Sequence, residues 1–211
     1  NDPGCRPTSA LDLAGFLARS TVNGPGTRAV VWVQGCPHRC PGCFNRDFWP
    51  FSSHNRVSVN GLAARILATT GISGVTFSGG EPFAQAEPLS TLGSLLRKAG
   101  LSVVTYSGYT VDQLAEGHDP AWPALLAVTD LLVAGPYIAE RDQPDPLKGS
   151  ANQQVVFLGN RLAPAHQPQG SDASAGFANI EFTIFPDGAV VTTGFPTSAI
   201  RSSMSSSSRR P

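Results

Sequence analysis

Three cysteines stand close together in this 211-residue chain, at Cys36, Cys40 and Cys43, with proline and glycine between them. Three and two residues separate neighbouring cysteines, and the intervening residue types allow the backbone to form a short loop. Thiolates in such a loop can converge on one inorganic centre. A cubane [4Fe–4S] cluster normally takes four cysteine ligands. Three local ligands without an obvious fourth therefore predict a cluster with one iron open to a substrate or cosubstrate.

A zinc site is the alternative for these cysteines. His38 lies two residues from both Cys36 and Cys40 and offers a Cys3His ligand set. Its position inside the first cysteine interval makes tetrahedral closure awkward, so we expect iron and regard His38 as a loop side chain near the cluster. The remaining cysteine, Cys5, stands alone near the first residue and is interpreted as an incidental thiol.

The cysteine spacing resembles that of the radical S-adenosylmethionine (SAM) superfamily. Further blocks resemble the activating enzyme of anaerobic ribonucleotide reductase and related glycyl-radical activases, in the same order along the chain. These blocks are residues 22–28, 34–45, 76–83, 105–110, 130–137 and 148–154. One departure stands out, because Ala134 replaces an aspartate that commonly ends the corresponding strand in activases.

The resemblance implies a site. Cys36, Cys40 and Cys43 would be catalytic residues that hold a [4Fe–4S] cluster, with SAM on the fourth iron. Glu81 would accept a hydrogen bond from the methionyl ammonium group of SAM. The cofactor-binding residues expected in full are Phe44, Ser78, Gly79, Gly80, Glu81, Tyr106, Ser107 and Asn152, with Tyr109 and Gln153 as further candidates.

The resemblance also implies an oxidoreductase activity. One electron from a reduced flavodoxin- or ferredoxin-type donor would cleave SAM, and the 5′-deoxyadenosyl radical would abstract a hydrogen atom from a glycyl-radical enzyme partner. The alternative is a biosynthetic radical SAM enzyme that modifies a peptide or small metabolite, which Ala134 and the long C-terminal region favour. A third hypothesis is a non-enzymatic iron–sulfur or zinc protein that binds a partner without cleaving SAM.

Alternating strand and helix patterns must position these residues. The expected strands are residues 29–34, 74–78, 101–106, 130–134 and 154–158, and the expected helices are 60–70, 84–99, 110–116 and 122–128. Four motifs fall immediately after expected strands: the cysteine loop, the turn at 79–81, residues 107–109 and residues 135–137. They are therefore expected on one rim of a parallel sheet. We therefore predict an α/β fold, a partial (β/α) barrel of the radical SAM type with a C-terminal β-hairpin formed by residues 180–185 and 189–193.

Four segments are expected along the chain. Residues 1–26 read as an irregular lead-in with a short apolar helical pattern near residues 11–17, and residues 27–160 as the core. Residues 161–196 would form the extension with the hairpin, and residues 197–211 a low-complexity, disordered tail. The chain opens with Asn1 rather than methionine, which indicates trimming or a start inside a longer chain.

Composition and charge restrict the expected binding partners and cellular location. Basic and acidic residues number 15 each, so the formal net charge of +0 gives no reason to expect nucleic-acid or membrane binding. No apolar run has the length of a transmembrane helix, and the first residues lack the apolar region of a secretory signal. Crowded cysteines that must remain free to bind iron favour a cytoplasmic location.

Overall fold

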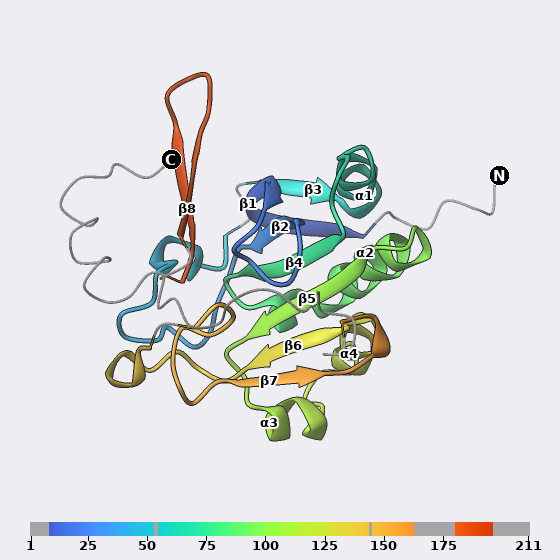
Figure 1. The fold of residues 1–211 in the computed structure, drawn as a ribbon. Coiled ribbons are helices and arrows are strands. Elements are labelled where there is room, and N and C mark those ends of the chain that lie inside the picture. Colours follow the sequence, from blue (N-terminus) through green and yellow to red (C-terminus); the bar gives the residue numbers. More distant parts are fainter. Residues whose placement is uncertain (1–8, 53–54, 144, 163–179, 196–211) are drawn as a thin grey trace.

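A seven-stranded sheet forms the frame of the protein in the computed structural model, which describes residues 9–52, 55–143, 145–162 and 180–195 (Figure 1). The strands are β1 (Ala10–Ser20), β2 (Arg28–Val33), β3 (Arg56–Ser58), β4 (Gly74–Gly79), β5 (Ser102–Ser107), β6 (Leu131–Ala134) and β7 (Gln154–Phe157). Their order across the sheet is β3-β1-β2-β4-β5-β6-β7. The four central strands β2, β4, β5 and β6 run parallel.

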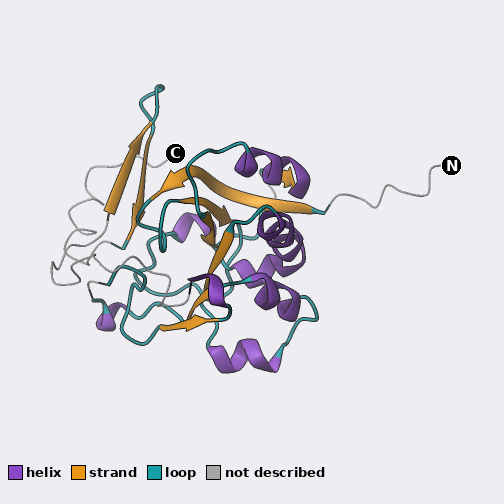
Figure 2. Ribbon diagram, turned by 45° about the vertical axis from the view of Figure 1, so that its right-hand side comes forward, coloured by secondary structure: helices purple, strands orange, loops and turns teal. Residues whose placement is uncertain are grey.

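Helices connect the parallel strands and gather on one side of the sheet (Figure 2). They are α1 (Val59–Leu67), α2 (Ala86–Lys98), α3 (Val111–Glu116) and α4 (Trp122–Val128), with short 3-10 turns at Arg46–Phe48, Pro82–Gln85, Ala139–Arg141 and Asn160–Leu162. Parallel neighbours need such crossovers because a tight turn cannot join them. The predicted α/β architecture, with a mostly parallel sheet and outer helices, is confirmed.

The main core lies between the sheet and this helical layer. Leu89, Leu92 and Leu96 recur at helical spacing on α2 and are fully buried against the sheet. Each such side chain contributes about 2 kcal/mol through removal from water. The indole of Trp122 on α4 donates to the carbonyl of Phe83 at 3.0 Å, which ties the last crossover to the turn after β4.

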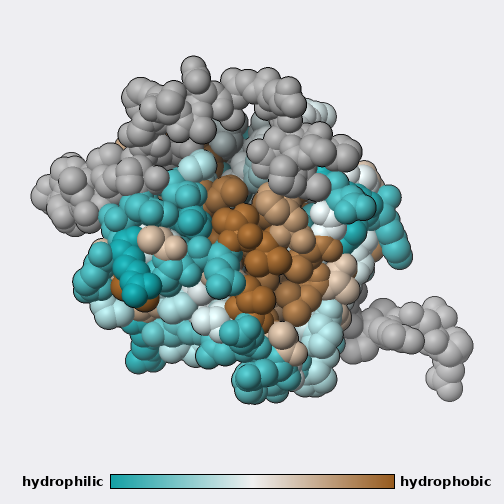
Figure 3. All heavy atoms as spheres, turned by 60° about the horizontal axis from the view of Figure 1, so that its bottom comes forward, coloured by the Kyte–Doolittle hydropathy of each residue, from teal (hydrophilic) through white to brown (hydrophobic). Residues whose placement is uncertain are grey.

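The opposite face of the sheet carries smaller apolar clusters and is covered differently. Val30 and Trp32 on β2 form one cluster with Leu17, and Val104 on β5 joins two residues of β6 in another. The predicted hairpin is present as β8 (Ile180–Ile184) and β9 (Val190–Gly194), and it rises away from the body in Figure 1. On the side of edge strand β7, hydrophobic residues gather on the surface (Figure 3).

Two expectations about the sheet were wrong. The lead-in contains no helix near residues 11–17, because β1 pairs antiparallel with both β2 and β3. Leu11, Leu13 and Leu17 are all odd-numbered, so their spacing fits the period of a strand as well as that of a helix. The predicted boundary after residue 26 therefore lies between two adjacent strands. Edge strand β7 runs antiparallel to β6, not parallel.

Several expectations fall outside the described residues. Cys5, most of the linker before the hairpin and the tail at 197–211 are among them. Within the described part, no helix is long and apolar enough to cross a membrane.

Candidate functional site

The four predicted motifs follow the C-terminal ends of the four parallel strands. β2 leads into the cysteine loop, β4 into Glu81, β5 into Ser107 and Gly108, and β6 into the turn at 135–137. Since these strands are neighbours and parallel, their ends share one edge of the sheet, where ligands bind in open α/β folds. The hydrogen bonds described next connect all four turns.

The cysteine loop is held at both ends by backbone hydrogen bonds. The amides of Gly35 and Cys36 donate to the carbonyls of Phe48 and Trp49 at 2.8 and 3.0 Å. Within the loop, the Cys43 amide donates to the carbonyl of Cys40 at 3.1 Å and closes a turn. The segment after the cysteines thus folds back beneath Cys36 and fixes the start of the loop.

The three cysteines are free thiols, with Cys36 buried and Cys40 and Cys43 half-buried. Burial raises the pKa of the Cys36 and Cys40 thiols, although backbone amides pointing at the sulfurs oppose this. The amides of His38 and Arg39 act on Cys36, and that of Tyr137 after β6 acts on Cys40. Amides directed at cysteine sulfur also tune iron–sulfur clusters, so the donor set fits such a group.

His38 is turned towards carboxylate and aromatic neighbours. Its ring packs edge-on against Tyr109 with centroids 4.4 Å apart, and its Nε2 lies 3.2 Å from Oε2 of Glu81, without hydrogen-bond alignment. Among the described residues, no three Cys, His, Asp or Glu side chains are placed to hold one metal ion. Three thiols in one loop fit a cubane, in which each thiolate binds a different iron.

The Glu81 carboxylate joins the turns after β4 and β5. It is 1% exposed and accepts hydrogen bonds from the Phe83 amide (2.9 Å), the Ser107 hydroxyl (3.0 Å) and the Gly108 amide (2.7 Å). An ionised carboxylate has about four acceptor positions. The protein itself fills three, so the expected contact with a SAM ammonium would compete for the position beside His38.

Gly79 and Gly80 bring the turn after β4 against the backbone of β2. Gly79 has φ +104°, and a side chain there would come within 2.5 Å of the Val33 nitrogen. A side chain at Gly80 would collide with the carbonyl of Gly35. The Glu81 amide donates to that same carbonyl at 2.8 Å. These glycines were expected to let the backbone approach a ligand closely, and in the structure they let it approach β2 and the start of the cysteine loop.

Two predicted residues carry buried polar atoms without partners among the described residues. The ring of Tyr106 is partly exposed, but its hydroxyl is buried and unpaired, and burial raises the pKa of this phenol well above its usual range. Asn152 donates through Nδ2 to the carbonyl of Pro136 at 2.8 Å, while its Oδ1 is buried and unpaired. Unsatisfied buried groups point to a missing partner. Both atoms therefore fit a polar ligand such as SAM.

The remaining predicted residues have clear positions. Phe44 follows Cys43 in the loop, and Ser78 lies on β4 beside Trp32. Gln153 holds the turn after β6 through a bond to the carbonyl of Gly135 at 3.0 Å. Ala134 is 1% exposed and packs in the main core on the helical side.

Sequence reasoning missed the contacts that connect the motifs. Gln85, which no motif includes, bonds to the backbone of Asp12 in both directions and to the carbonyl of Gln34 at 2.8 Å. It thereby holds β1 and the start of the cysteine loop against the turn after β4. The sequence signal that could have identified Gln85 was an amide side chain close to the Gly-Gly-Glu turn.

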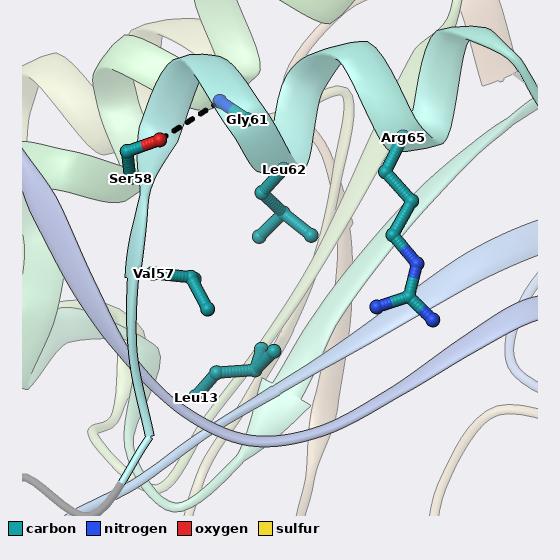
Figure 4. A pocket seen from close by; sticks show the side chains of 6 residues that line it. All are labelled: Leu13, Val57, Ser58, Gly61, Leu62 and Arg65. Atoms are coloured by element: carbon teal, nitrogen blue, oxygen red, sulfur yellow. Dashed lines mark hydrogen bonds between the residues drawn. The ribbon is translucent and has the colours of Figure 1, made fainter.

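A separate small cavity of about 290 Å³ lies between β1, β3 and α1 (Figure 4). Leu13, Val57 and Leu62 point into it, and Arg65 lies at one side, as Figure 4 shows. None of the cysteines or strand-end motifs lines it. It is therefore not the site for the predicted chemistry.

Comparison with known proteins decides the family. The family model described as a 4Fe-4S single cluster domain matches residues 22–156, which include all four strand-end motifs. The chain belongs to this family. The expected resemblance to radical SAM activases is confirmed by relatives named anaerobic ribonucleoside-triphosphate reductase-activating protein. That of Vibrio cholerae is 36% identical over 145 residues, covering 64% of this chain and 90% of the relative. That of Escherichia coli K12 is 30% identical over 150 residues, covering 65% and 92%.

Two further similarities extend the comparison. The pyruvate formate-lyase 1-activating enzyme of Escherichia coli K12 is 32% identical over 153 residues, covering 70% of this chain and 61% of the relative. The solved structure of QueE from Escherichia coli gives a TM-score of 0.38 at 20% identity, over 48% of this chain and 53% of that one. Family and relatives together imply an iron–sulfur cluster and SAM as cofactors, and the relatives favour an activase over a biosynthetic enzyme.

Proposed function

We propose that this protein activates a glycyl-radical enzyme, with an anaerobic ribonucleoside-triphosphate reductase as the first candidate partner. The proposal rests on one observation: a loop with three free thiols meets the turns of three neighbouring parallel strands at one edge of the sheet. The most similar relatives described above take their names from such partners. A reduced flavodoxin- or ferredoxin-type protein would supply the electron.

Cys36, Cys40 and Cys43 would hold the cluster, with backbone amides directed at two of the sulfurs. With its cofactors bound, the site supplies one-electron cleavage of SAM to methionine and a 5′-deoxyadenosyl radical, which takes a hydrogen atom from a partner glycine. The chain's own residues bind, orient and exclude water. The Tyr106 hydroxyl and Asn152 Oδ1 would meet polar groups of SAM, and Phe44, Ser78 and Ser107 would line the same pocket.

The biosynthetic alternative loses one of its two supports. Ala134 lies in the main core on the helical side of the sheet, 1% exposed. An aspartate side chain at this position would lie beside Ser107, which contacts Glu81, on the helical side of the sheet and not on the open face where Tyr106 packs. Its replacement therefore says little about a substrate that approaches the open face. The region after residue 156, outside the family match, remains as the feature that favours a different substrate.

The test is an anaerobic assay of reconstituted protein with reductant, SAM and the anaerobic ribonucleoside-triphosphate reductase of the source organism. We expect 5′-deoxyadenosine and a glycyl radical visible by electron paramagnetic resonance. Cys36→Ala should abolish both while leaving the apo protein folded, because the thiol contributes little to packing beyond a small apolar volume. A second ligand variant, Cys43→Ser with added cluster reagents, should fail in the same way.

The outcomes separate the three hypotheses. SAM cleavage without a glycyl radical, on either this reductase or the organism's pyruvate formate-lyase, would move the assignment to a biosynthetic enzyme. A cluster that forms and never cleaves SAM would leave the non-enzymatic binding protein.

A further inference from the structure

The β8–β9 hairpin lies outside the part of the chain that matches the family. The match ends at residue 156, whereas the hairpin spans Ile180–Gly194. The sheet, the helices and all four strand-end motifs are complete without it. A well-formed element added to a complete core requires an explanation of its own.

One face of the hairpin is fastened to the body by polar contacts. The Glu181 carboxylate accepts from the Thr21 amide at 2.9 Å and from the Thr21 hydroxyl at 3.2 Å. Thr193, 4% exposed, exchanges hydrogen bonds with Asn23 at 2.9 and 3.1 Å. Val191 adds an apolar contact to the cluster on β2. The hairpin is therefore held in one orientation by its inward face.

The outward face exposes three apolar side chains. Phe182 is 55% exposed, Ile184 74% and Val190 44%, and Ile184 stands opposite Val190 in the hairpin register. Alternation along a strand places polar residues on a solvent face in most antiparallel sheets. Contiguous exposed apolar side chains of this kind mark an interaction surface.

The hairpin stands beside the candidate site. Val191 shares its cluster with Trp32 and Phe48, and the Phe48 carbonyl anchors the cysteine loop through Gly35. Phe195, just after β9, packs on Tyr106 with ring centroids 5.6 Å apart. A protein that brings a backbone glycine to the open face of the sheet would meet this hairpin on the way.

The size and composition of the surroundings restrict what covers the outward face. The three apolar side chains expose roughly 300 Å², well below the 800 Å² per partner of a stable interface, which argues against a dimer of this chain built on this face. The flanking segments 163–179 and 196–211 consist mainly of small and polar residues and offer few large apolar side chains to cover it. A small apolar face beside a site is instead suited to part of a larger, transient contact.

We propose that Phe182, Ile184 and Val190 on the outward face of the β8–β9 hairpin dock the protein whose glycine is oxidised, an inference that rests on the proposed function. The occupant is a protein surface with an apolar depression. The hairpin lengthens the residence time of that protein at the site and takes no part in SAM cleavage.

The test uses the double variant Phe182→Ser/Ile184→Ser in the full chain with reconstituted cluster. The control is Leu67→Ser, which changes a 46% exposed leucine at the end of α1. Glycyl-radical formation is measured against concentration of the organism's reductase, and 5′-deoxyadenosine is measured without it. We expect the half-saturating reductase concentration to rise at least about tenfold in the double variant, as for loss of interface hot spots. The control and the partner-free deoxyadenosine yield should equal those of the wild type.

Each other outcome is informative. Equal half-saturation in the double variant and the wild type would overturn the docking role and leave the proposed function intact. Loss of deoxyadenosine without reductase would show that the hairpin supports the site itself. A wild-type dimer that dissociates on the same substitutions would assign the face to a second copy. A wild type that cleaves SAM but never activates the reductase would end the proposed function and this inference together. Should the double variant lose its unfolding transition, Ile184→Ser alone gives the same comparison.

Discussion

Two buried charged side chains, Arg28 and Glu81, occupy opposite ends of the parallel strands. Arg28 begins β2 and is 0% exposed, and Glu81 follows β4 and is 1% exposed. In the part of the chain that the structure describes, neither has an oppositely charged partner in hydrogen-bond geometry. Arg28 donates to neutral oxygens, and Glu81 accepts from neutral donors.

The origin of their partners distinguishes the two. The Arg28 guanidinium bonds to the Thr76 hydroxyl, to the hydroxyl and carbonyl of Ser102 and to the Val75 carbonyl, all near the starts of neighbouring strands, and to the Pro25 carbonyl. Burial lowers the pKa of Arg28 to about 10. Glu81 collects its donors from the turns that carry the site. A buried charge thus closes the fold at one end and arranges the chemistry at the other, in both cases neutralised by dipoles.

Arg28→Met should be the most damaging substitution of this comparison. It leaves five hydrogen bonds unmade at buried oxygens, which should lower the free energy of unfolding by about 3–5 kcal/mol. Chemical denaturation of the apo protein measures this. Arg161→Met is the control, because the Arg161 side chain is exposed and should cost at most about 0.5 kcal/mol. Equal stability of both variants would show that the network around Arg28 is dispensable.

Glu81→Gln should damage stability less and activity more. Its amide would direct N–H groups at a donor such as the Gly108 amide, and the loss should be about 1–3 kcal/mol. Displacement of the turns should lower 5′-deoxyadenosine formation roughly ten- to a hundredfold. Glu87→Gln in the exposed first turn of α2 is the control, with a change within about 0.5 kcal/mol. Unchanged stability with lost activity would instead assign Glu81 to the ligand alone.

Tyr106→Phe should have the smallest effect and the opposite sign at neutral pH. It removes a buried hydroxyl that has no hydrogen-bond partner among the described residues, so the apo protein should gain up to about 1 kcal/mol. Burial raises the phenol pKa above its ordinary value of 10.0, so the folded state keeps a proton that the unfolded chain releases. The stability of the wild type is therefore unaffected by this group below pH 10, and it falls as the pH rises from 10 through the folded pKa.

Denaturation of the Tyr106→Phe variant and the wild type at pH 7 and above pH 10 checks this prediction. The stability advantage of the variant should grow at the higher pH, because only the wild type has a buried phenol that the unfolded chain ionises more readily. A variant that is less stable at pH 7 would mean that the hydroxyl has a partner in solution.

Sequence predicted the order of the elements and the rim on which the motifs lie. The spacing of apolar residues was sufficient to predict α2 and α4, and the boundaries of α4 at 122–128 are as expected. It was insufficient for β1, because three odd-numbered leucines satisfy both periods and the choice depends on pairing with β2 and β3. The antiparallel direction of β7 likewise depends on the path of the loop before it.

Within the site, sequence identified residue types and could not identify their partners. Glu81 was expected to meet a ligand, and its contacts with Ser107 and Gly108 arise only when β4 and β5 lie side by side. The roles of His38 and Gln85 depend in the same way on neighbouring turns. Such contacts join residues far apart along the chain, which no local pattern encodes.

The absence of side chains at Gly79 and Gly80 has a consequence for evolution. Backbone contact with β2 and Gly35 excludes any larger residue at these positions before a ligand is considered. A descendant that lost SAM chemistry but kept the sheet would therefore still be selected to retain both glycines. Retention of this pair across relatives would record the packing of two chain segments, and the cysteines would be the first positions to drift.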